Sequence, residues 1–211
     1  MRACNICGRE DFIPGPNGRL TGSGAPPRCA RCRSLERQRS LHAFLSRIPP
    51  EVLSWRRAIQ FAPDSSLDPG WFRSFETSTY EGANSIDLQE IDRPDNSYDF
   101  ISLSMVLEFV VDDKRAFREL VRVGSDTCII HNSSGSVVNA PTSTHYGEGH
   151  GAFGRFHYYG RDIEARFETA RHSLSTLLVR SVDPVTGVPD DIHFFCRQRD
   201  DAELLSASLA Q

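Results

Sequence analysis

The sequence has no apolar run close to the roughly 20 residues of a membrane span, which argues against contact with a membrane. We also expect no signal peptide, because Met1-Arg2-Ala3 leads directly into a cysteine pair. No internal repeat is present, which argues against a solenoid or a propeller. We therefore expect a cytoplasmic protein with reduced thiols. Its 211 residues suffice for one ordinary domain and a small appendage.

Cysteine is scarce, but four of the six cysteines form two pairs near the N-terminus. The pairs are Cys4-x₂-Cys7 and Cys29-x₂-Cys32, with 21 residues between them. This spacing suits one tetrahedral zinc ion bound by four thiolates. The intervening stretch is too rich in Gly and Pro to build a core, and structural zinc contributes roughly 10–16 kcal/mol to such small modules. Two disulfides are the alternative.

Charge is distributed unevenly along the chain. Residues 1–48 carry nine Arg against three acidic residues, whereas the rest carries 15 basic against 25 acidic residues. A basic module on an acidic body can bind nucleic acid, or it can dock on that body. Docking is favoured, because the module lacks clustered Lys and aromatic residues, and nucleic acid stays the less favoured partner.

The pattern along the chain is an alternation of strands and helices. We expect a helix after Ser34 that ends at Pro49-Pro50. We expect strands at 57–62, 75–80, 84–88, 98–104, 127–131, 174–180 and 192–197, and helices at 67–75, 113–123, 161–170 and, frayed, 203–211. This order predicts an α/β fold, a mostly parallel sheet with helices on both faces. The expected division is a zinc ribbon (1–35), a linker helix (36–56), the main domain (57–200) and a tail (201–211).

Residues 94–123, "PDNSYDFISLSMVLEFVVDDKRAFRELVRV", resemble the region after the first motif of class I S-adenosylmethionine (SAM)-dependent methyltransferases. The segments "CNICG…CARCRSLERQR", "AIQFAPD" and "YYGRDIEARF" resemble a bacterial subgroup with an N-terminal zinc ribbon. The resemblance implies a Rossmann-like sheet behind a Cys4 ribbon, with SAM as cofactor and zinc as a structural ion.

The same resemblance implies a cofactor site at the carboxyl ends of the strands. Its residues would be Phe61, Ala62, Pro63, Asp64, Asp87, Leu88, Ser104, Met105 and Leu107. The family's Gly-x-Gly-x-Gly turn is absent, and Phe61-Ala62-Pro63-Asp64 replaces it. Asp64 would meet the methionyl ammonium or cap a helix, and Asp87 would accept the adenine amine or occupy a surface turn. Glu76 or Glu81 would bind the ribose hydroxyls.

Residues 132–160 form a long segment rich in Gly, Ser, His and Tyr, and such long connections are usually functional or disordered. We expect a lid from His145 to Tyr159. Candidates for orienting the nucleophile or taking its proton are His157, Tyr158 and His150, and candidates for facing the substrate are His145, Tyr146 and Tyr159. Packing is the alternative for each of them, and a second metal site made by the three histidines is less favoured.

Three functions remain open from the sequence. The first is a methyltransferase acting on a small molecule. The second is an enzyme that cyclises SAM itself, releasing methylthioadenosine and a small cyclic amino acid. The third is a degenerate fold whose ribbon binds RNA or protein. The oligomeric state is unknown from these patterns.

Overall fold

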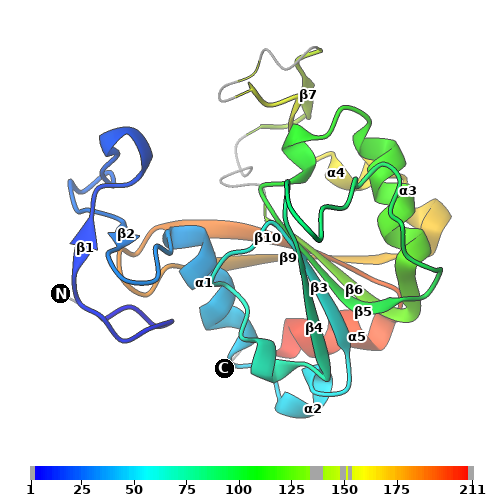
Figure 1. The fold of residues 1–211 in the computed structure, drawn as a ribbon, viewed down its shortest axis with the longest axis horizontal. Coiled ribbons are helices and arrows are strands. Elements are labelled where there is room, and N and C mark those ends of the chain that lie inside the picture. Colours follow the sequence, from blue (N-terminus) through cyan, green and yellow to red (C-terminus); the bar gives the residue numbers. More distant parts are fainter. Residues whose placement is uncertain (1–2, 134–139, 148–150, 152–153, 209–211) are drawn as a thin grey trace.

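The computed structural model describes residues 3–133, 140–147, 151 and 154–208. Its centre is a six-stranded sheet with the order β4-β3-β5-β6-β10-β9 (Figure 1). The strands are β3 (Arg57–Phe61), β4 (Ser74–Ser78), β5 (Tyr98–Ser104), β6 (Gly124–Ser133), β9 (Ser175–Val182) and β10 (Pro189–Cys196). The first four are parallel, and β10 runs antiparallel between β6 and β9.

Helices cover both faces of this sheet, as predicted. One apolar cluster joins the sheet to α3 (Asp113–Val123) and α4 (Ile163–Arg166), and the other joins it to α1 (Glu36–Leu45), α2 (Pro50–Leu53) and α5 (Arg199–Ala207). Every residue of β5 is buried, because this central parallel strand is covered on both sides. The Asp112 side chain accepts a hydrogen bond from the Arg115 backbone and caps α3 as expected.

The expected strand at 84–88 is absent, and this prediction was wrong. A single bridge joins Thr79 to Ser85, and the segment then turns. The Asp87 carboxylate accepts a hydrogen bond from the Gln89 backbone at 2.8 Å, so local turn chemistry prevails over strand pairing.

Three expected helices have different bounds in the structure. The helix at 67–75 shrinks to a 3-10 turn at Pro69–Trp71. The helix at 161–170 splits into α4 and a 3-10 turn at Thr169–His172, because Glu168 between them has a left-handed backbone with φ of 49°. The tail helix is ordered from Arg199 onward, since Leu205 is buried against the sheet. Among the described residues, every helix is too short or too polar to span a bilayer.

The N-terminal module contains β1 (Phe12–Ile13), a 3-10 turn (Pro16–Gly18) and β2 (Arg28–Cys29), and it lies against α1 (Figure 1). Arg19 forms a two-pronged ion pair with Glu36, with N–O distances of 2.8 and 2.7 Å. The Asn5 side chain donates to the Arg39 carbonyl at 3.0 Å. These contacts hold the module against α1.

Helix α1 is a part of the body, although the sequence indicated a linker. Its residues Leu41, Phe44 and Leu45 are buried in the core. Arg39 pairs with Asp183 in the turn between β9 and β10 through two bonds of 2.8 and 2.7 Å, and both side chains are fully buried. Arg39 thus connects α1 to the turn that joins the last two strands of the sheet.

Candidate functional site

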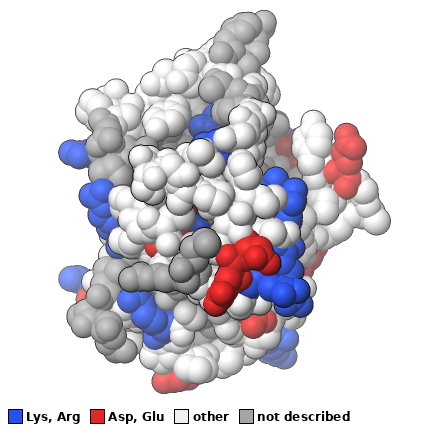
Figure 2. All heavy atoms as spheres, turned by 90° about the vertical axis from the view of Figure 1, so that its left-hand side faces the viewer, with Lys and Arg blue, Asp and Glu red and all other residues white. Residues whose placement is uncertain are grey.

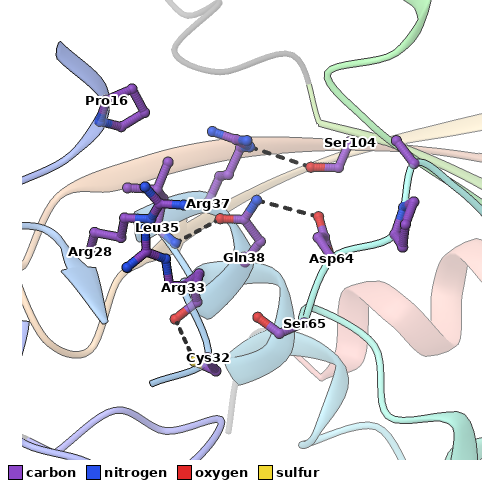
Figure 3. Close-up of a pocket in the computed structure, with 13 residues that line it drawn as sticks. Pro16, Arg28, Cys32, Arg33, Leu35, Arg37, Gln38, Asp64, Ser65 and Ser104 are labelled. Atoms are coloured by element: carbon purple, nitrogen blue, oxygen red, sulfur yellow. Dashed lines mark hydrogen bonds between the residues drawn. The ribbon is translucent and has the colours of Figure 1, made fainter. Parts of the chain in front are cut away.

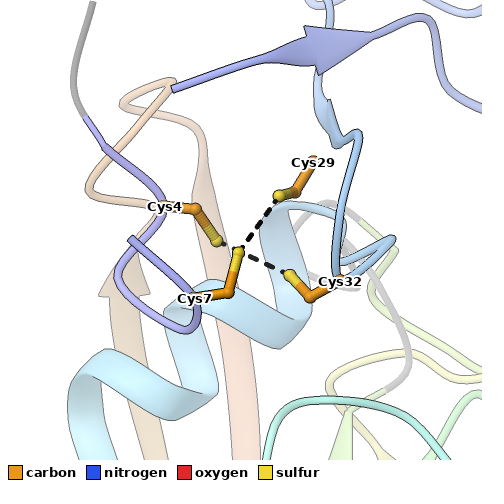
Figure 4. Close-up of side chains that lie close together, drawn as sticks. All are labelled: Cys4, Cys7, Cys29 and Cys32. Carbon is orange, nitrogen blue, oxygen red and sulfur yellow. Dashed lines mark hydrogen bonds between the residues drawn. The ribbon is translucent and has the colours of Figure 1, made fainter. Parts of the chain in front are cut away.

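The four paired cysteines converge as the spacing predicted (Figure 4). Their sulfur atoms all lie within 4.8 Å of one another. Sγ of Cys4 lies 3.7 Å from that of Cys32, and Sγ of Cys7 lies 3.5 Å from that of Cys29. Four Zn–S bonds of about 2.3 Å in a tetrahedron place the sulfurs about 3.8 Å apart, so the donor set fits zinc. The distances are far from the roughly 2.0 Å of a disulfide, and all four thiols are free.

Two turns at the carboxyl edge of the sheet have unusual backbone conformations. Ala62 follows β3 with φ of 61°, and Met105 follows β5 with φ of 59°. The left-handed conformation costs an L-residue roughly 1–2 kcal/mol, and such strain concentrates at functional sites. Ala62 lies at the turn where the family that the chain resembles has a glycine-rich segment.

The larger of two cavities at this edge has a volume of about 550 Å³. It is lined by Phe61, Ala62, Ser78, Thr79, Tyr80, Glu81, Ser85, Ile86, Asp87, Leu88, Gln89, Val106, Phe109, Val110 and Val111. Apolar side chains make up much of the wall, and two carboxylates stand among them. This composition suits a flat heterocycle joined to a polar group.

The structure separates the two ribose candidates. Glu81 lines the larger cavity. Glu76 lies within β4, where its carboxylate accepts hydrogen bonds from Tyr98, Arg93 and Asn84. Glu76 is thus engaged in the fold, and Glu81 is the acidic residue available to a ligand.

The smaller cavity has a volume of about 390 Å³ and lies between the module, α1 and the turn after β3 (Figure 3). It is lined by Pro16, Arg28, Cys32, Arg33, Ser34, Leu35, Arg37, Gln38, Ala62, Pro63, Asp64, Ser65 and Ser104. Ala62 belongs to the walls of both cavities. The turn after β3 therefore contributes to both cavities.

Asp64 holds the turn after β3 rather than capping a helix, and it also faces the smaller cavity. Its carboxylate accepts from the Ser66 backbone at 2.8 Å and from the Gln60 side chain at 2.9 Å, which holds the turn. It also accepts from the Gln38 side chain at 3.3 Å and faces the smaller cavity.

Arg37 and Asp190 are two charged residues near this cavity that sequence reasoning missed. Arg37 Nε donates to Ser104 Oγ at 3.4 Å, and burial lowers the pKa of this guanidinium although nearby carboxylates oppose the shift. Burial raises the pKa of Asp190 to about 7, and the charge of Arg37 limits that rise. Within the described part of the chain, Asp190 Oδ2 has no hydrogen-bond partner. The adjacent Asp190 and Asp191 at the start of an apolar strand were the available signal.

The predicted lid residues lie in very different surroundings. His157 is buried, and its Nε2 lies 2.9 Å from the Val110 carbonyl oxygen. Burial lowers its pKa, and the carboxylate of Asp113 opposes that shift. Tyr159 is fully buried, and its hydroxyl lies within hydrogen-bond distance of two acceptors, the Leu107 carbonyl at 3.1 Å and the Asp113 carboxylate at 3.0 Å. Neither His157 nor Tyr159 lines either cavity.

The other lid candidates lie nearer the surface. His145 belongs to β7 (Thr144–His145), which pairs with β8 (His157–Tyr158). His145 and Tyr146 are exposed, and Tyr158 is half-buried. His150 lies outside the described residues. The lid and its catalytic roles stay predictions.

Of the predicted cofactor residues, two contribute to neither cavity wall. Met105 is half-buried, and Leu107 is fully buried in the core as part of a 3-10 turn (Leu107–Phe109). Phe156 N donates to the Glu108 carbonyl at 2.8 Å, so the segment before β8 is fixed to this turn.

Residues 75–128 match a family model described as a methyltransferase domain. The matched run contains most of the residues that line the larger cavity, together with β5 and α3. The match confirms the resemblance to class I SAM-dependent methyltransferases. The sheet order and the helices on both faces agree with the Rossmann-like fold that this class implies.

Several solved structures are similar to this chain. N-methyltransferase NodS from Bradyrhizobium japonicum WM9, in complex with S-adenosylhomocysteine, is 12% identical with a TM-score of 0.49, over 74% of this chain and 84% of that one. A SAM-dependent methyltransferase from Mesorhizobium loti is 13% identical with a TM-score of 0.47, over 74% and 96% of the two chains. The 1,6-didemethyltoxoflavin-N1-methyltransferase of Burkholderia thailandensis is 9% identical with a TM-score of 0.46, over 75% of each chain. No curated protein matches the chain.

Proposed function

We propose that the protein is a SAM-dependent methyltransferase acting on a small molecule. The observation that carries the proposal is the meeting of two unlike cavities at Ala62, at the carboxyl edge of a parallel sheet. Ligands of such sheets bind beyond the carboxyl ends of the strands. The largely apolar cavity suits the adenosine part of SAM, and the polar cavity suits its amino acid end. When bound, SAM supplies an electrophilic methyl group.

The chain's own residues would hold the two ends of SAM. Glu81 would accept from the ribose hydroxyls, and Asp87 would accept from the exocyclic amine of adenine. Asp64 would pair with the ammonium group, and Arg37 would pair with the carboxylate. Glu81 and Asp87 line the larger cavity, and the oppositely charged Asp64 and Arg37 line the smaller one, where they would meet the two charged groups of the amino acid end.

The surface favours a small molecule over nucleic acid as the partner. On the face shown in Figure 2, the basic side chains lie in separate groups interrupted by uncharged and acidic surface. A nucleic-acid interface usually presents a continuous basic patch or stripe. Arg19 of the module and Arg39 of the neighbouring helix α1 are also occupied by ion pairs.

Calorimetry with SAM tests the binding site. Asp87→Ala and Asp64→Asn should each weaken SAM binding by roughly 0.5–1.5 kcal/mol, the net value of a hydrogen bond. Asparagine at position 64 keeps an oxygen for the turn but removes the charge. Glu90→Ala is the control, because Glu90 is largely exposed and lines neither cavity. Unchanged SAM affinity in both site variants would exclude this pocket.

Product analysis separates the possible reactions of SAM. Methyl transfer yields S-adenosylhomocysteine, whereas cyclisation of SAM yields methylthioadenosine. The proposal requires S-adenosylhomocysteine. Salt-sensitive RNA binding without any turnover would instead support a binding module.

A further inference from the structure

The second cysteine knuckle carries an arginine where the first has glycine. Gly8 follows Cys7 with φ of 73°, and its N–H donates to the Cys4 carbonyl at 2.8 Å. Arg33 follows Cys32 with φ of 64°, and its N–H donates to the Cys29 carbonyl at 3.1 Å. The two turns thus have the same backbone shape, which favours glycine because an L-residue there is strained by roughly 1–2 kcal/mol.

The side chain of Arg33 gives a reason for this exception. Arg33 lines the smaller cavity, and its side chain also reaches solvent. A non-glycine residue held in a left-handed conformation is typical of ligand sites, where the surrounding structure maintains the strain. The cysteine cluster provides such a structure, because it holds the turn on both sides.

Arg28 stands on the same wall of the cavity. It belongs to β2, directly before Cys29, and its Nε is buried without a hydrogen-bond partner in the part of the chain that the structure describes. Figure 3 shows Arg28, Arg33 and Arg37 gathered on one side of the pocket, across from Asp64. A buried polar atom without a hydrogen-bond partner destabilises the folded protein. Binding of a ligand that accepts a hydrogen bond from Arg28 would therefore be favoured.

The charges of this wall are not neutralised by close partners. Neither Arg28 nor Arg33 forms an ion pair with any described residue, in contrast to Arg19 and Arg39 nearby. Asp64 is the one carboxylate among the described residues lining this cavity, against three arginines. The cavity therefore has an excess of positive charge.

We propose that Arg28 and Arg33 of the cysteine module bind an anionic group, a carboxylate or a phosphate, of the methyl-accepting substrate. Guanidinium groups recognise both anions through paired hydrogen bonds. The inference rests on the proposed function in treating this ligand as the acceptor, and it assigns the module a direct part in substrate choice. The volume of about 390 Å³ is shared with the amino acid end of SAM, which restricts the acceptor to a small acid or phosphate ester.

Titration of the zinc-loaded full chain with anions tests the site without any turnover. Inorganic phosphate and N-acetylglycine serve as probes at low ionic strength. Tighter binding of inorganic phosphate indicates a phosphate group on the acceptor, and tighter binding of N-acetylglycine indicates a carboxylate. The favoured probe should bind Arg33→Gly at least roughly tenfold more weakly, as expected for loss of a charge-assisted pair.

Arg33→Gly is a suitable variant because glycine is the residue that this backbone conformation favours, so the fold should be retained. Arg28→Gln is the second variant, with the same expected loss. Arg31→Gln is the matched control, since Arg31 is exposed in the same knuckle and lines neither cavity. Equal weakening in the control, unchanged binding in both variants, or no binding of either probe to the wild type would overturn the proposal.

A parallel titration with SAM keeps the two proposals distinguishable. Arg33→Gly should bind SAM within about twofold of the wild type, because no cofactor contact is assigned to Arg33. A wild type that binds the anion but not SAM would refute the proposed function and leave the anion site standing. A neutral acceptor methylated equally by wild type and Arg33→Gly would overturn the assignment of the acceptor class.

Discussion

The buried pair of Arg39 and Asp183 provides the sharpest test of how the module, α1 and the sheet are held together. Both side chains are fully buried, and two bonds of 2.8 and 2.7 Å join them. Asp183→Asn keeps the shape and an oxygen for the Thr186 backbone but leaves the charge of Arg39 without its partner. Breaking such a pair costs about 3–5 kcal/mol. For a chain of this size, about 2–4 °C per kcal/mol gives a fall in Tm of roughly 10 °C.

Urea unfolding and thermal scans of the wild type and Asp183→Asn measure this loss. Glu203→Gln is the control, because its ion pair with Arg199 is exposed and should change stability by less than about 0.5 kcal/mol. Burial would raise the pKa of Asp183, but the hydrogen bonds and charge of Arg39 hold it below its usual value. The pair therefore contributes to the free energy of unfolding above the pKa of Asp183 in the unfolded chain, near 4. This contribution is lost as pH falls through the lower pKa of Asp183 in the folded protein. A loss below about 1 kcal/mol at neutral pH would refute the reasoning.

Four further predictions concern the site. Cys29→Ser should release the zinc and loosen residues 3–35, and metal analysis finding no zinc in the freshly purified wild type, with both cysteine pairs oxidised, would contradict it. The folded pKa of Asp190 is raised to about 7, so its stabilising effect is complete below pH 4 and lost as pH rises through 7. Relative to Asp190→Asn, the wild type should lose about 2 kcal/mol between pH 5 and pH 8 in urea unfolding, and parallel pH profiles would contradict this. His157→Phe should lower stability by roughly 1–3 kcal/mol, because the Val110 carbonyl loses its donor. Tyr158→Phe should lower turnover more than SAM affinity, and an equal loss of stability in both variants would end the lid hypothesis.

The sequence predicted the elements whose pattern is strong and local. β5 and α3 have nearly the expected bounds, because a continuous apolar run and a capped amphipathic stretch each have one low-energy conformation. The cysteine cluster was also predictable, since its chemistry depends on spacing alone. The segment at 84–88 was not, because the turn at Asp87 competes with strand pairing over only a few residues.

The cationic wall of the smaller cavity was beyond sequence reasoning. Arg33 and Arg28 look like solvated surface charges until the module docks on α1 and faces them toward the turn after β3. Asp190 approaches Arg37 only through the order of strands in the sheet, which places β10 beside β6. Left-handed backbone at Ala62 was equally hidden, since alanine carries no signal for it.

The bond between Arg39 and Asp183 also affects the timing of synthesis. The two residues are 144 positions apart, so the ribosome needs roughly 7 to 30 s to reach the second after making the first. All four cysteines and α1 emerge before any strand of the sheet. The module can therefore capture its metal while α1 still lacks its buried counterion, and the pairing of Arg39 with Asp183 waits for the last two strands.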